Sequence, residues 1–139
     1  MADHTHTRTA SCACGGLKVT TRSEPISVYV CSCLDCQRKT GSAFSFCATY
    51  RKAAVSITGE HRPWRKTGDA GRWVEFSFCP TCGGSVFAHF EALPDLVGVS
   101  AGCFADPQFA MPGTHYWASR QHRWLGWPED TEAMATQPD

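Results

Sequence analysis

The sequence predicts a mainly-β domain with many short strands and little helix, in which cysteine-rich turns tie the strands together. Short runs that alternate apolar and polar residues recur along the chain, and glycines and prolines separate them. No segment holds the 3.6-residue period of a long amphipathic helix, and no internal repeat is visible. The chain has nine cysteines, most of them in closely spaced groups.

Length and composition limit the class of protein. With 139 residues, 42% of them hydrophobic, the chain is long enough to bury the core of one domain. The formal net charge is +0, which argues against binding nucleic acid through a basic face. No apolar run is long enough to cross a bilayer, and residues 1–6 lack the basic and apolar regions of a secretory signal. We therefore expect a cytoplasmic protein without nucleic-acid or membrane partners.

The first part of the chain leads into a cysteine-rich turn. Residues 1–10 are polar and are expected to form a flexible tail. Alternation of apolar and polar residues predicts strands at residues 17–21 and 26–31. The run from Leu34 to Thr40, which Gly41 follows, predicts a helix of one or two turns.

The rest of the chain is predicted as strands joined by turns. These strands are expected at residues 44–50, 55–58, 63–66, 72–78, 85–90, 96–100 and 115–118. The run at residues 63–66 is expected at a sheet edge. The tryptophans expected in the core are Trp64, Trp73 and Trp117. Trp124 and Trp127 are the exceptions, since they stand in a polar segment. One domain is expected over residues 11–127, with a polar tail over residues 128–139.

The cysteines carry the strongest chemical signal. An odd number of cysteines without a secretory signal favours metal binding over disulfides. Cys31, Cys33 and Cys36 fall in one short stretch, too close for good disulfide geometry, and offer three soft ligands from one turn of backbone. A zinc ion bound by thiolates usually takes four ligands, and this stretch contains no fourth one.

A second motif, Cys79-Pro80-Thr81-Cys82-Gly83-Gly84, has the form of a zinc knuckle. Its turn aims two thiolates at one metal, and its glycines free backbone amides to donate to the sulfurs. Cys12 and Cys14 can add two thiolates and close a site whose role would be structural. The alternative is that Cys12 and Cys14 are ordinary buried thiols.

Cys31, Cys33 and Cys36 would then hold a second zinc ion with an open fourth position. Such an ion is a Lewis acid that can hold water or an incoming thiol, deprotonated near neutral pH. The alternative is that a protein side chain closes the site. The side chains that could close it are Cys47, His89, Cys103 and His115.

Arg38 and Lys39 follow Cys36 closely. A short helix would put both at the rim of the metal, where they could anchor the carboxylates of an acidic thiol ligand. The alternative is a solvated basic pair.

In this order, the motifs resemble the glutathione-dependent formaldehyde-activating enzyme family, which also includes centromere protein V. The segments that carry the resemblance are residues 12–16, 31–42, 78–83, 102–107 and 115–117, with Trp124. It extends over residues 11–127, nearly the whole chain. Two positions depart from the family pattern. Gln37 stands where a basic residue is frequent, and Cys103 stands where a small hydroxyl residue is common.

The resemblance implies a β-tent fold of several small coiled antiparallel sheets. It also implies two zinc ions, each with its own ligands. The implied ligands are Cys12, Cys14, Cys79 and Cys82 for a structural ion, and Cys31, Cys33 and Cys36 for a catalytic one. The implied activity is the condensation of formaldehyde with glutathione to S-(hydroxymethyl)glutathione, a carbon–sulfur lyase-type reaction.

Three functions stay open on the sequence. The first is an enzyme that joins a small thiol, such as glutathione, to a small aldehyde. The second is a thiol- or metal-binding module without turnover, and the third is a scaffold. For the enzyme, the candidates for a general acid that protonates the aldehyde oxygen are Asp35, His89 and His115.

Overall fold

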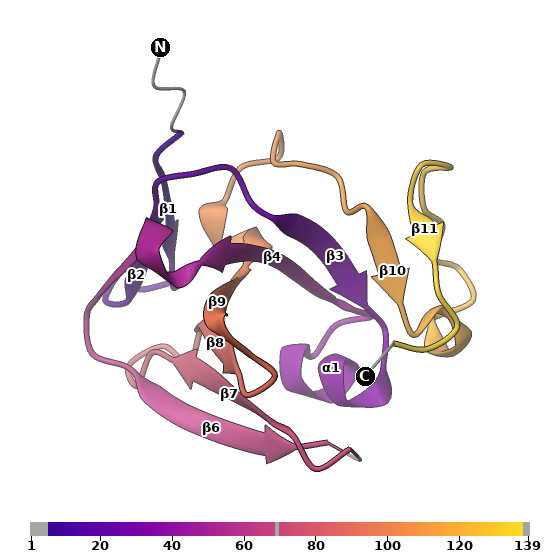
Figure 1. The fold of residues 1–139 in the computed structure, drawn as a ribbon, viewed down its shortest axis with the longest axis horizontal. Helices are drawn as coiled ribbons and strands as arrows, with labels where there is room; N and C mark the ends of the chain where they lie inside the picture. The colour runs from indigo at the N-terminus through magenta and orange to yellow at the C-terminus, as the bar shows by residue number, and fades with distance from the viewer. Residues whose placement is uncertain (1–5, 69, 138–139) are drawn as a thin grey trace.

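The computed structural model describes residues 6–68 and 70–137, which form two β-sheets around one core (Figure 1). The three-stranded sheet has the order β1 (Arg8–Ser11), β2 (Lys18–Thr21) and β5 (Val55–Thr58). The eight-stranded sheet has the order β11 (Glu132–Ala133), β10 (Thr114–Tyr116), β3 (Ser27–Cys31), β4 (Ser45–Arg51), β9 (Leu93–Ser100), β8 (Ser85–Phe90), β7 (Trp73–Phe78) and β6 (Arg62–Thr67). The prediction of a mainly-β fold with little helix is confirmed, while the name β-tent stays a prediction.

The described part of the chain contains one α-helix, α1 (Leu34–Thr40), where the sequence predicts it. It also contains three short 3₁₀ helices, η1 (Lys52–Ala54), η2 (Ala101–Phe104) and η3 (Ala118–Arg120). Gly41 ends α1 with a φ of 66°, and its N–H donates to the carbonyl of Gln37 at 2.8 Å. Glycine adopts this left-handed conformation without strain, so the chain can turn from α1 towards β4.

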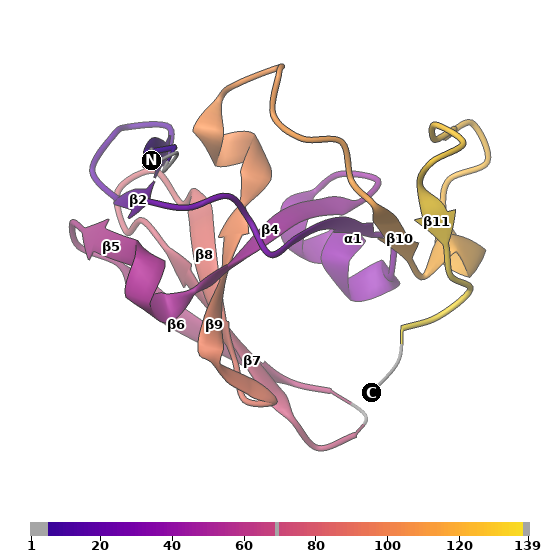
Figure 2. The same cartoon turned by 45° about the horizontal axis from the view of Figure 1, so that its top comes forward.

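Neighbouring strands are antiparallel except at β10, which runs parallel to β3 and to β11. The register of β10 with β3 aligns Tyr116 with Cys31. The late part of the chain therefore lies beside the end of β3, where the first cysteine-rich turn begins. Figures 1 and 2 show β10 and β11 at the opposite end of the molecule from β2.

The strands are found where the sequence predicts them, with small shifts at their ends. The strand expected at residues 115–118 ends at Tyr116, because Trp117 takes a left-handed φ of 56°. The strand expected at residues 63–66 forms the edge strand β6, as predicted. The sequence did not predict β1 and β11, which lack a clear alternation and gain their strand conformation by pairing with β2 and β10.

Two of the strands lie in the segments expected to be tails. Strand β1 starts at Arg8, and Ala10 on it is buried. Strand β11 lies within the segment 128–139. Of the flexible tail expected at residues 1–10, residues 1–5 lie outside the described residues, whereas residues 8–10 belong to β1. The domain boundaries stay a prediction.

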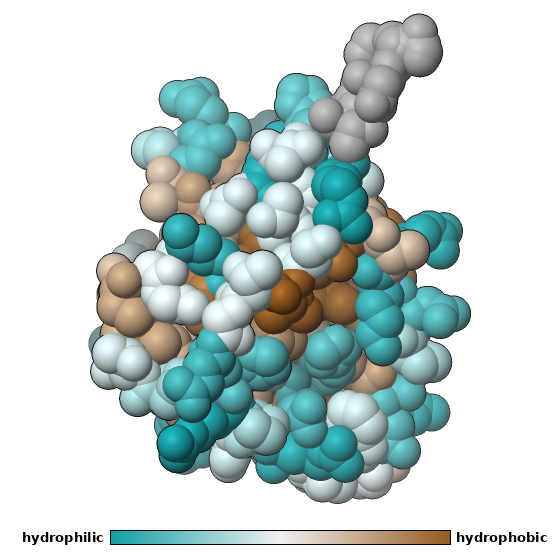
Figure 3. Space-filling view, turned by 90° about the vertical axis from the view of Figure 1, so that its left-hand side faces the viewer, coloured by the Kyte–Doolittle hydropathy of each residue, from teal (hydrophilic) through white to brown (hydrophobic). Residues whose placement is uncertain are grey.

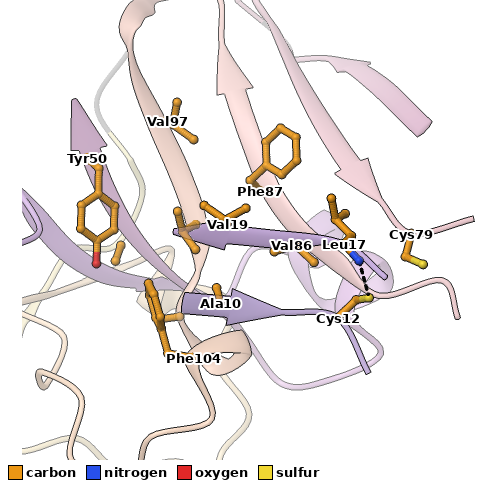
Figure 4. Close-up of a cluster of buried hydrophobic side chains, with 13 residues drawn as sticks. Ala10, Cys12, Leu17, Val19, Tyr50, Cys79, Val86, Phe87, Val97 and Phe104 are labelled. Carbon is orange, nitrogen blue, oxygen red and sulfur yellow. Dashed lines mark hydrogen bonds between the residues drawn. The ribbon is translucent and has the colours of Figure 1, made fainter. Parts of the chain in front are cut away.

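Side chains of both sheets share one core (Figure 4). Val19 of the three-stranded sheet packs in one cluster with Val86 and Val99 of the larger sheet. Cys12 and Cys79 belong to the same cluster and lie close together at one end of it in Figure 4. A group of thiols is therefore built into the apolar core.

The expectation for the tryptophans is wrong, since none of the five is buried. Trp64 is 50% exposed because β6 is an edge strand, and its ring stacks on Phe76 with the ring centroids 5.9 Å apart. Trp73 and Trp117 are half-buried, and Trp124 is 74% exposed.

The surface viewed from the side of β1 and β2 is mostly hydrophilic or neutral around a small apolar area (Figure 3). Within residues 6–68 and 70–137, no helix has the length and apolar character needed to cross a membrane.

Candidate thiol clusters and the cavity beside them

Four cysteines from two distant turns meet at one end of the core and are called the four-cysteine cluster here. Cys12 and Cys14 lie between β1 and β2, and Cys79 and Cys82 lie between β7 and β8. Their sulfur atoms all lie within 4.8 Å of one another. The Cys14 sulfur is 3.7 Å from that of Cys12 and 3.6 Å from that of Cys79. The structure thus brings together the four residues that the sequence groups.

Backbone amides donate to these sulfurs. The N–H of Leu17 donates to Cys12 Sγ at 3.2 Å, and the N–H of Thr81 donates to Cys79 Sγ at 3.3 Å. The Leu17 amide is the main reason that the pKa of Cys12 is lowered to about 6. Amides directed at sulfur favour the thiolate, which is the form that binds a metal.

The spacing of the four-cysteine cluster fits a tetrahedral metal ion. Four thiolates at about 2.3 Å from a zinc ion lie about 3.8 Å from one another. The separations of 3.6 and 3.7 Å are close to this value. Four protein ligands complete a tetrahedron, so the arrangement suits a structural ion without an open position.

The three-cysteine cluster consists of Cys31, Cys33 and Cys36. Cys31 ends β3, Cys33 caps α1, and Cys36 lies in the first turn of that helix. Their sulfur atoms lie within 4.8 Å of one another. The N–H of Cys36 donates to Cys33 Sγ at 3.3 Å, so the start of the helix holds this sulfur in place. The strand-to-helix turn alone is enough to build the cluster.

Hydrogen bonds among these three neighbouring thiols shift their pKa values in opposite directions. The pKa of Cys33 is lowered to about 2, chiefly because the thiols of Cys31 and Cys36 donate to its thiolate. The pKa of Cys31 is raised by the same contacts, since Cys33 and Cys36 stabilise its protonated form. A cation among the three sulfurs would favour the thiolate at every position.

Within the described residues, no other His, Cys, Asp or Glu brings a ligand atom within 4.8 Å of all three sulfurs. The candidates for closing the cluster have other contacts. His115 Nε2 lies 2.7 Å from Ser32 Oγ, and the Cys103 thiol donates to the Ser85 carbonyl at 3.7 Å. The ring of His89 lies 5.6 Å from that of Phe87. Among the described His, Cys, Asp and Glu residues, the three-cysteine cluster therefore offers three sulfur atoms and no fourth ligand.

Ser32, between Cys31 and Cys33, has a hydrogen-bond partner for its N–H, its carbonyl and its hydroxyl. Its N–H donates to the carbonyl of Tyr116 at 3.0 Å, and its carbonyl accepts from Gln37 Nε2 at 2.8 Å. Its hydroxyl lies 2.7 Å from Nε2 of His115, and both side chains are fully buried. Gln37 thus has a positioning role here.

A cavity of about 570 Å³ lies beside the three-cysteine cluster. Cys31 and Cys36 form part of its wall, whereas none of the four-cysteine cluster does. Its larger apolar side chains are Val74, Phe76 and Phe90. Its hydroxyl groups come from Tyr29, Thr40, Ser45, Ser85 and Ser100. The second cluster thus borders a space large enough for a small organic molecule.

The basic residues Arg38 and Lys39 differ in their position relative to the cavity. Lys39 lines the cavity, where its Nζ donates to Ser85 Oγ at 2.8 Å and lies 4.1 Å from the centre of the Phe76 ring. Burial lowers the pKa of Lys39. Arg38 is exposed, lies 3.6 Å from Asp35, and does not line the cavity. Of the two predicted anchors, only Lys39 faces the space beside the cysteines.

The candidates for a general acid do not line the cavity. Asp35 lies 2.9 Å from Lys66 on the outside, and His115 is directed at Ser32. Tyr29, which the sequence analysis missed, does line it, and burial raises the pKa of its hydroxyl well above the usual range. The alternation of β3 could have indicated this, because Tyr29 and Cys31 share one face of the strand.

The fold and the two thiol clusters define the class of this protein. It is a mainly-β domain with cysteine clusters that could hold metal ions, one of them beside a cavity for a small molecule. Within this class, the family model described as glutathione-dependent formaldehyde-activating enzyme matches residues 7–120. The chain belongs to this family, and the resemblance found in its motifs is confirmed.

A solved structure supports the fold. The crystal structure of a Rhodobacter sphaeroides protein superposes with a TM-score of 0.54 at 20% sequence identity. The match covers 68% of this chain and 85% of that one. At this identity the likeness shows the fold alone. None of the curated proteins matches the chain.

Proposed function

We propose that the protein joins a small thiol, glutathione or a similar one, to formaldehyde or another small aldehyde. It would be a zinc-dependent enzyme of the carbon–sulfur lyase type. The observation that carries the proposal is the position of Cys31 and Cys36 on the cavity wall, in a cluster with three described ligands. Membership of the family supports the pairing of a thiol with formaldehyde. All nine cysteines are free, as they would be in a reducing cytoplasm.

The donor atoms fit zinc, because thiolates are soft ligands that zinc prefers. The four-cysteine cluster would hold a structural ion, and Cys31, Cys33 and Cys36 would hold a second ion. When bound there, the second ion supplies the Lewis acidity that keeps a coordinated thiol in its thiolate form near neutral pH.

The residues of the chain orient the reactants. The turn from β3 into α1 fixes the three sulfurs at the edge of the cavity, so a thiol held there meets the aldehyde at high effective concentration. The ammonium group of Lys39 binds a carboxylate of the thiol substrate. The hydroxyl of Tyr29, which lines the cavity, donates to the aldehyde oxygen.

The reaction needs no oxidant or reductant. The thiol releases its proton to solvent, and its sulfur adds to the carbonyl carbon. One carbon–sulfur bond forms while the carbonyl π bond breaks, and the electron pair moves to oxygen. The oxygen takes a proton through Tyr29, which solvent then reprotonates. With glutathione and formaldehyde, the product is S-(hydroxymethyl)glutathione.

Cobalt substitution tests the proposal. We expect the sulfur-to-cobalt charge-transfer band to grow when glutathione is added, and not with S-methylglutathione, which has no thiol to ionise. NMR exchange spectroscopy with labelled formaldehyde should show faster interconversion with the adduct than occurs without protein. An unchanged spectrum and an unchanged exchange rate would leave a binding module or scaffold instead of an enzyme.

A further inference from the structure

We infer that the cavity takes a thiol with an apolar body and a single carboxylate, and that it binds such a thiol better than a tripeptide with two carboxylates. This inference rests on the proposed function and names the class of its thiol substrate. It is based on the shape, the polarity and the charge of the cavity wall.

One part of the cavity wall is apolar. Phe76 and Val74 lie on β7, and Phe90 lies on β8 opposite Val74, so neighbouring strands present apolar side chains to one space. Apolar ligand surface is stabilised here because burial removes it from water. The polar backbone of a peptide would have to exchange its hydrogen bonds with water for a few hydroxyl groups.

Gly98 on β9 makes room for the ring of Phe90. A Cβ atom at this position would lie 2.7 Å from Cζ of Phe90 and 3.0 Å from the sulfur of Cys47. Because glycine has no side chain, the Phe90 ring lies directly over the strand and the cavity stays open. The wall is thereby shaped for a flat apolar group.

Apart from the cysteines, the described part of the cavity wall carries one charged side chain, which is a cation. Among the described residues that line it, Lys39 alone has an ionised side chain of the Lys, Arg, Asp or Glu type. Its ammonium group has three donors, of which one goes to Ser85 at 2.8 Å. A ligand carboxylate can take another donor. A second carboxylate, as in glutathione, would find no further cation on this wall, and its desolvation would weaken binding.

The test uses ligands without a thiol or an aldehyde, so that it does not depend on the metal chemistry. Phenylpropionate has the apolar body and one carboxylate, phenylpropanol is its uncharged counterpart, and S-methylglutathione is the peptide counterpart. Calorimetry with the zinc-loaded protein measures the three affinities. We expect phenylpropionate to bind more tightly than either of the others.

Variants of the wall locate the binding. Lys39→Met should weaken phenylpropionate binding about tenfold or more, because a charge-assisted hydrogen bond is lost, and Lys39→Arg should restore part of it. Phenylpropanol should bind to Lys39→Met and to the unmodified protein equally. The matched control is Lys18→Met, which removes an exposed lysine of β2 that does not line the cavity, and which should leave all affinities unchanged.

A second pair of variants addresses the apolar body. Val74→Trp should fill the space and abolish phenylpropionate binding, whereas Val74→Ala should keep it. Circular dichroism confirms that each variant is folded before affinities are compared.

Three results would overturn the inference: tighter binding of S-methylglutathione than of phenylpropionate, no binding of phenylpropionate, or an affinity for phenylpropionate that neither Lys39→Met nor Val74→Trp reduces. The proposed function fails separately, if no thiol changes the cobalt spectrum. Phenylpropionate binding without a thiol response would refute the function alone. A glutathione response without phenylpropionate binding would refute this inference alone.

Discussion

The two thiol clusters use the same ligand and differ in what they join. The four-cysteine cluster connects the turn after β1 with the turn after β7, and two of its members belong to the apolar core. The three-cysteine cluster is built within one strand-to-helix turn and borders the cavity. Ligands far apart in sequence close a long loop, so a metal bound by them stabilises the fold. Ligands close together close only a short loop, so a metal bound by the three-cysteine cluster would contribute less to the stability of the fold.

The largest expected effect comes from Cys79→Ser in the four-cysteine cluster. Structural zinc contributes on the order of 10 kcal/mol, comparable with the stability of a whole domain. We expect loss of this metal and loss of cooperative unfolding, measured by metal analysis and circular dichroism. Cys103→Ser, outside both clusters, is the control and should melt cooperatively. A stable, metal-free and fully folded Cys79→Ser protein would contradict a structural role.

The matching change in the other cluster is Cys33→Ser. It should remove the second metal and the response of cobalt to glutathione, yet leave cooperative unfolding, because the four-cysteine cluster still holds the core together. Metal content and thermal melting are measured together. If Cys33→Ser unfolds as readily as Cys79→Ser, the two clusters do not differ in role and the enzyme proposal loses its main support.

Tyr29→Phe tests the chemistry of the cavity without touching a ligand. Removing the hydroxyl that donates to the aldehyde oxygen should lower the rate of adduct formation about 10²-fold. Thiol binding, measured by the cobalt spectrum, should be retained. Tyr50→Phe is the control, since Tyr50 is fully buried in the core and does not line the cavity. Equal rates for the two variants would remove Tyr29 from the mechanism.

The smallest expected effect concerns the residues that hold each turn. Ser32→Ala leaves Nε2 of the buried His115 without its partner and should lower the free energy of unfolding by about 1–2 kcal/mol. Ser11→Ala is the counterpart beside the four-cysteine cluster, where the hydroxyl donates only to the carbonyl of Cys12. Denaturant titration should show the smaller change for Ser11→Ala. The reverse order would mean that His115 does not hold the three-cysteine turn.

The sequence by itself determined the features that depend on neighbouring residues. Alternation located the strands, and Gly41 located the end of α1, because both signals act over a few residues. The spacing of Cys31, Cys33 and Cys36 was sufficient to predict their cluster, since one turn of backbone brings them together. Strands β1 and β11 escaped prediction because pairing with other strands, and not their own pattern, makes them strands.

Only the tertiary structure decided what surrounds the three-cysteine cluster. The cavity wall comes from β3, β4, β7, β8 and β9, which are brought together by long-range pairing. Arg38 and Lys39 look equivalent in the sequence, but successive residues of a helix point about 100° apart, so one faces solvent and the other the cavity. The positions of β7 and β8 decide which side of α1 faces the cavity. No local pattern near residue 39 contains that information.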